Sequence, residues 1–133
     1  MKTIVMAFGL MISAAAFGDG FGAMGQTERC ASWVSHAMYG ATQSMRGASR
    51  EVEFVQRSNL VELLARSRSL GGNKLYILVD EQDTEGERSF MERSILFGFD
   101  AMTDWQSRNA GMSPRRDEWQ RNFMAMCLDY EAI

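Results

Sequence analysis

Acidic side chains within residues 80–92 have the clearest metal-binding spacing in the chain. Positions 1, 3, 5 and 12 of a calcium-binding EF-hand loop would be Glu81, Asp83, Glu85 and Glu92. Gly86 matches position 6, but glutamate stands at position 1, where the tight turn needs aspartate. The competing interpretation is an acidic loop that leads into the first turn of a helix, where the helix dipole favours negative charge. We expect no bound metal or cofactor, and calcium binding or an enzyme that uses this loop is the alternative.

Other polar side chains offer only parts of a catalytic site. His36 is the one histidine, so neither a Ser–His–acid triad nor a two-histidine metal site can be assembled. Asp100 and Asp104 share a helix face, whereas a glycosidase needs two carboxylates that converge across a cleft. Residues 124–127, Met-Ala-Met-Cys, suit copper(I), but the cysteine has another expected use. We therefore predict no catalytic residues and favour a protein that is not an enzyme.

Composition limits the class of protein. The chain has 133 residues and a net charge of −3, which fits one globular domain. A negative balance argues against binding nucleic acid through a basic surface.

The first 18 residues have the pattern of a secretory signal peptide. Lys2 precedes an apolar run at 3–12 that is too short to span a bilayer, and small residues follow it. Cleavage after Ala16 and cleavage after Gly18 fit equally well. A flexible, glycine-rich mature N-terminus at 19–26 and a helical domain at 27–133 would follow. We expect an exported protein, periplasmic or secreted.

Export determines the expected redox state of the two cysteines. In an oxidising compartment Cys30 and Cys127 are predicted to form a disulfide, because only one intramolecular pairing exists. Such a bond requires the first helix and the last helix to run antiparallel with their ends together.

Helical periodicity predicts long helices over 28–46, 48–70, the segment from Thr84 to about 108, and 113–133. A break near 58–59 is an open alternative for the second of them. Thr84 and Glu87 have capping-box spacing, and Gly98 marks an expected close helix–helix approach. Residues 74–79 are ambiguous: they could form a strand, but no partner strand is evident, so we favour a buried connector or short helix. The fold class predicted is all-α, a small bundle of four to five helices with one disulfide.

The layout resembles a group of small exported proteins of proteobacteria and their phages. The residues that carry the resemblance are Cys30, the turn Met45-Arg46-x-x-Ser49, the aromatic helix from Phe97 to Trp105, and Phe123-x-x-x-Cys127. The resemblance implies an exported location and a helical fold, and it transfers no site residues.

The function expected is binding of an envelope protein or of the membrane surface, with accessory roles in phage lysis control or exclusion as hypotheses if the gene belongs to a phage. Tryptophan and arginine favour protein interfaces. The interaction residues predicted are Trp33, Trp105 and Trp119. The sequence indicates neither the partner nor the oligomeric state.

Overall fold

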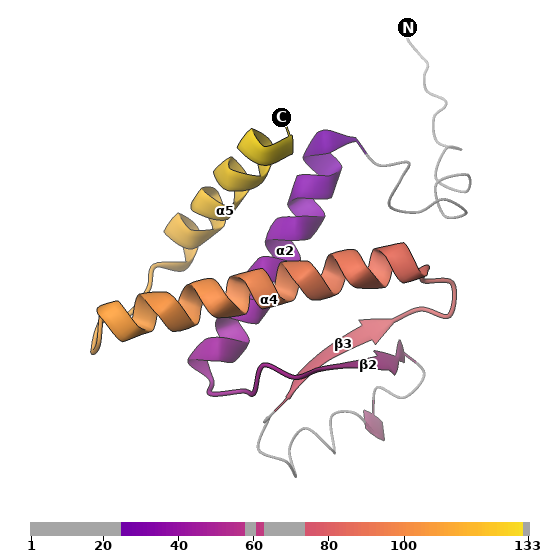
Figure 1. Ribbon diagram of the computed structural model, residues 1–133, viewed down its shortest axis with the longest axis horizontal. Helices are drawn as coiled ribbons and strands as arrows, with labels where there is room; N and C mark the ends of the chain where they lie inside the picture. Colours follow the sequence, from indigo (N-terminus) through magenta and orange to yellow (C-terminus); the bar gives the residue numbers. More distant parts are fainter. Residues whose placement is uncertain (1–24, 58–60, 63–73, 132–133) are drawn as a thin grey trace, which may run out of the picture.

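Figure 1 shows the computed structural model, which describes residues 25–57, 61–62 and 74–131. The elements in chain order are α2 (Gln26–Met45), β2 (Val52–Gln56), β3 (Leu75–Val79), α4 (Glu85–Arg108) and α5 (Arg116–Glu131). The predicted signal peptide lies outside the described residues, and so does all but the end of the predicted flexible segment at 19–26. Within the described part, no helix is both long enough and apolar enough to cross a membrane.

The crossing of α2 and α4 is the largest contact between helices and depends on two glycines (Figure 1). A Cβ atom on Gly40 of α2 would overlap the backbone carbonyl of Ile95, and one on Gly98 of α4 would overlap the backbone carbonyl of Ala37. The two backbones therefore touch at this crossing. The close approach predicted at Gly98 is confirmed, and Gly40 is its counterpart on the other helix.

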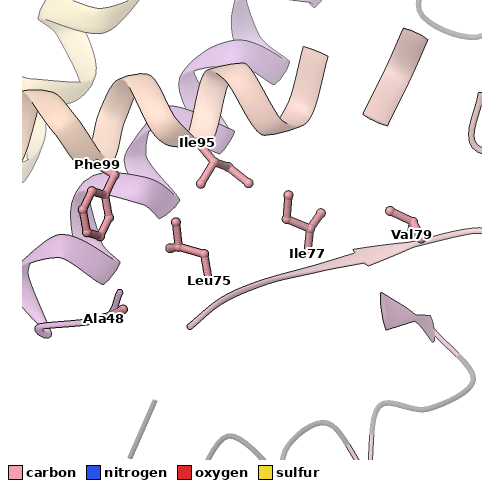
Figure 2. Close-up of a cluster of buried hydrophobic side chains, with 6 residues drawn as sticks. All are labelled: Ala48, Leu75, Ile77, Val79, Ile95 and Phe99. Atoms are coloured by element: carbon pink, nitrogen blue, oxygen red, sulfur yellow. The ribbon is translucent and has the colours of Figure 1, made fainter. Parts of the chain in front are cut away.

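Strands β2 and β3 form a two-stranded parallel sheet in which Val52 is paired with Leu75 and Gln56 with Val79. Leu75, Ile77 and Val79 point from β3 towards Ile95 and Phe99 of α4 (Figure 2). These side chains are buried, so β3 holds one side of the core while α4 covers it.

The sheet overturns the prediction of an all-α bundle of four to five helices. Residues 52–56 form a strand where a helix was predicted over 48–70, and residues 75–79 form its partner rather than a connector or short helix. The rest of 48–70 lies largely outside the described residues. The physical reason is mutual: each segment is too short to be stable as an isolated strand, and each satisfies the backbone groups of the other.

The predicted disulfide is confirmed. Cys30 near the start of α2 is bonded to Cys127 near the end of α5, with the two Cα atoms 5.6 Å apart. As expected, the first and last described helices lie side by side and run in opposite directions (Figure 1). The last helix begins at Arg116, later than predicted from Ser113 and Pro114, because the carbonyl of Arg115 accepts the first helical hydrogen bond, from Trp119.

Two hydrophobic clusters make up the core. The first joins the sheet, the turn at Ala48 and α4 (Figure 2). The second joins α2, α4 and α5, and its buried members are Val34, Ala37, Ala41, Met102 and Phe123. The second cluster fixes α5 beside α2 and so creates the surface described next.

Candidate functional site

The acidic segment caps a helix instead of forming a calcium loop. The backbone N–H of Glu87 donates to Oγ1 of Thr84 at 3.1 Å, and the N–H of Thr84 donates to the carboxylate of Glu87 at 3.0 Å. The predicted capping box is thereby confirmed. Asp83 accepts the N–H of Asp80 at 3.0 Å, and partial burial raises the pKa of Asp83.

The four candidate calcium ligands of the alternative interpretation do not surround a common point. Helix α4 begins at Glu85, so Glu85 and Glu92 are separated by seven residues of helix, or about 10 Å along its axis. Glu81 lies in the exposed turn before the helix. Among the described residues, no three side chains of the histidine, cysteine, aspartate or glutamate type are grouped so as to hold a metal ion.

Each carboxylate of the pair on α4 is engaged by its own arginine. The guanidinium of Arg50 donates through Nε and Nη2 to the two oxygens of Asp100, both at 2.8 Å, and these bonds lower the pKa of Asp100. Asp104 accepts from Arg108 one turn further along the helix. Both ion pairs are exposed; the first joins the segment before β2 to α4, and the second lies within α4.

The other candidate side chains from the sequence, His36 and the residues of the Met-Ala-Met-Cys segment, are described next. Nδ1 of His36 lies 2.7 Å from the carbonyl oxygen of Ser32 on the same helix. Cys127 is in the disulfide, while Met124 packs against the second cluster and Met126 is exposed. A thiolate ligand for copper is therefore not present in the oxidised protein.

The three predicted interaction residues belong to one aromatic cluster. Its ring contacts run from Trp105 to Trp119 (6.0 Å between centroids), on to Phe123 (5.5 Å), to Trp33 (5.7 Å) and to Phe97 (5.0 Å). The tryptophans are partly buried against the second hydrophobic cluster. Substituting them would disturb packing, and contact with a partner through these rings stays a prediction.

A groove of about 540 Å³ lies between α2 and α5. Its lining comes from one face of each helix: Ala31, Val34, Ser35, Met38, Tyr39, Thr42, Gln43 and Arg46 from α2, and Arg116, Gln120 and Met124 from α5. The size is that of pockets that hold small ligands. Because the helices are antiparallel, Arg46 at the end of α2 and Arg116 at the start of α5 lie at the same end of the groove.

Two arginines lie at that end, where the first turn of α5 also carries Glu118 and Asp117, the latter paired with Arg121. Neither Arg46 nor Arg116 forms an ion pair within residues 25–57, 61–62 and 74–131. The first turn of α5 adds unpaired backbone N–H groups and the positive end of its helix dipole. Burial raises the pKa of Tyr39 in the middle of the groove, and the nearby charge of Arg46 offsets part of this rise. The hydroxyl of Tyr39 donates to the backbone carbonyl of Tyr76 at 2.7 Å and anchors the groove wall to β3.

The groove was not predicted from the sequence, although one signal for it exists. Arg116, Gln120 and Met124 recur every four residues and define a second face of the last helix, beside the aromatic face that attracts attention first. This face forms a groove only because α2 lies beside it, and the periodicity of the last helix does not indicate that neighbour.

Searches of protein-family models, of curated proteins and of solved structures found no match to this chain.

Proposed function

We propose that the protein is an exported, non-enzymatic binding protein that holds an envelope protein or the membrane surface at the groove between α2 and α5. The observation that carries the proposal is the groove itself, which combines an apolar wall with two arginines that have no acidic partner among the described residues. Binding surfaces of this kind join an apolar contact to a few charged groups that orient the partner.

Export is part of the proposal. A disulfide fits an oxidising environment, and this one joins cysteines that would stay reduced in most cytosols. The leader-like residues 1–18 supply a route to such an environment. A periplasmic or secreted location, and an origin in a proteobacterium or its phage, follow from the sequence pattern and remain proposals with it.

The state of the polar side chains favours binding over catalysis. Asp83, Asp100 and Asp104, which had the most suggestive spacing, each accept hydrogen bonds that order a turn or an exposed ion pair. By contrast, the charges in the groove are left for something outside the described chain to neutralise.

Reversing the charge of the groove tests the proposal. The variant carrying Arg46→Glu and Arg116→Glu is expected to cosediment with washed bacterial envelope membranes at least about tenfold less than the parent protein, because charge complementarity at the surface becomes repulsion. Arg93→Glu is the matched control, since Arg93 is an exposed arginine of α4 outside the groove lining. Protease treatment of the membranes beforehand separates a protein partner from the lipid surface.

Equal retention of the parent, the groove variant and the Arg93 control would contradict the proposal. Circular dichroism and the melting temperature of each variant show that the comparison is made between folded proteins.

A further inference from the structure

The groove is polar at one end and apolar at the other. Its apolar half, nearer the disulfide, is lined by Ala31, Val34, Met38 and Met124, with Ser35 as the one polar side chain among them, and Tyr39 lies in the middle of the groove. Its polar half is lined by Thr42, Gln43, Arg46, Arg116 and Gln120. The lining therefore changes from apolar to polar along the length of the groove and not from one wall to the other.

The two halves have similar lengths. On α2 the apolar half extends from Ala31 to Met38, seven residues or about 10 Å of helix, and the polar half from Met38 to Arg46, eight residues or about 12 Å. A partner helix laid in the groove would need an apolar stripe along its whole contact. A groove divided along its axis instead matches a ligand with a tail at one end and a head at the other.

The side chains of the polar half indicate the chemistry of the ligand's head group. Arginine forks bind phosphate oxygens through paired hydrogen bonds, and Arg46 and Arg116 have no carboxylate partner among the residues the structure describes. Thr42, Gln43 and Gln120 offer a hydroxyl and two amides to uncharged hydroxyl groups. A phosphate that carries glycerol hydroxyls uses both kinds of group, whereas a bare carboxylate uses only the arginines.

We propose that the groove binds an anionic lysophospholipid, with its glycerophosphate head at Arg46 and Arg116 and its single acyl chain along Met38 and Met124. The inference rests on the proposed function, because it names the ligand class of the same groove. The volume of about 540 Å³ for the whole groove is that of a small-ligand pocket. The apolar half is shorter than the roughly 15 Å of one bilayer leaflet, so it holds the part of the acyl chain nearest the head. A ligand of this class reaches an exported protein from the membrane surface.

Calorimetry with short-chain lipids below their micelle concentrations tests the inference. Lauroyl lysophosphatidylglycerol is expected to bind the oxidised protein saturably at one site. Lauroyl lysophosphatidylcholine, which adds a cationic choline to the same tail and phosphate, is expected to bind at least tenfold more weakly. Dodecanoate, which has the tail without the glycerophosphate, and glycerol 3-phosphate, which has the head without the tail, are both expected to bind more weakly as well.

Variants locate the two ends of the ligand. Arg46→Gln and Arg116→Gln should each weaken binding of lysophosphatidylglycerol about tenfold, while Arg93→Gln leaves it unchanged. In spectra of the methionine methyl groups, the signals of Met38 and Met124 should shift on titration. Those of Met91, which packs against the other hydrophobic cluster, and of the exposed Met112 should not.

Four results would overturn the inference: no saturable binding of lysophosphatidylglycerol, equal affinity for lysophosphatidylcholine, tighter binding of dodecanoate, or methyl shifts that avoid Met38 and Met124. If envelope binding still depends on Arg46 and Arg116 after any of these results, the proposed function stands and only the lysophospholipid is excluded. If neither envelope nor lipid binding depends on the arginines, both proposals fail.

Discussion

Replacing Gly98 with alanine is expected to destabilise the protein by about 3 kcal/mol or more, lowering its melting temperature by roughly 10 °C or more. The added methyl group would overlap the carbonyl carbon, carbonyl oxygen and Cα of Ala37. These are backbone atoms of α2, so no side-chain rotation relieves the overlap and the two helices must separate. The gain in helix propensity from glycine to alanine is only about 1 kcal/mol and does not compensate.

A second glycine of the same helix provides the control. A Cβ atom on Gly86 meets only Oγ1 of Thr84 at 3.9 Å, an ordinary contact. Gly86→Ala is therefore expected to leave stability unchanged or to raise it by up to about 1 kcal/mol. Gly40→Ala, which places a methyl group on the carbonyl of Ile95, should match Gly98→Ala. Thermal unfolding followed by circular dichroism measures all three, and a Gly98→Ala protein as stable as the Gly86→Ala protein would contradict the crossing described here.

Removing the disulfide with Cys30→Ala and Cys127→Ala is expected to lower the free energy of unfolding by about 4 kcal/mol. The bond closes a loop with a sequence separation of 97, for which the chain-entropy model gives about 4–5 kcal/mol, and measured values are often lower. Both cysteines are buried where α5 meets α2, so some packing is lost as well. For a domain whose total stability is about 5–15 kcal/mol, the loss is a large fraction.

Reductant supplies the matched comparison for this prediction. Urea unfolding of the parent protein with reductant should approach that of the double variant, and the double variant itself should not respond to reductant. Equal unfolding midpoints for the oxidised parent and the double variant would show that the disulfide does not stabilise the fold.

Features fixed by neighbouring residues were predictable from the sequence. The first helix was predicted to end at residue 46; it ends at Met45, and Gly47 just beyond it has a φ of 80°, a conformation that favours glycine. The Thr84–Glu87 capping box follows the same pattern. In each case a short run of sequence sets both the geometry and the residue types that allow it.

The sheet was not predictable in this way because it joins segments that are remote from each other. Val52 and Val55 fit an inward helical stripe as well as a short strand, and Leu75 to Val79 is apolar throughout. Only the pairing of Val52 with Leu75, 23 positions apart, decides between these interpretations. Parallel strands also need a crossover connection, for which local periodicity gives no signal.

The groove was missed for a related reason. The sequence drew attention to the tryptophans, and the structure places Trp119, the one tryptophan of α5, in a packed cluster with Trp105 and Phe123. The groove depends instead on how α2 and α5 are placed beside each other. One face of each helix lines the groove without packing tightly against the other helix. That arrangement is set by the disulfide between Cys30 and Cys127 and by the packing of Phe123 against α2 and α4. Both join residues that are far apart in the sequence.

Intact-mass analysis of the protein recovered from the periplasm or medium of producing cells tests the central claim, that this is an exported domain closed by one disulfide. The account predicts a chain that has lost its first 16 or 18 residues, takes up no alkylating reagent before reduction, and takes up two equivalents after it. A full-length chain that remains inside the cell with two free thiols would contradict it.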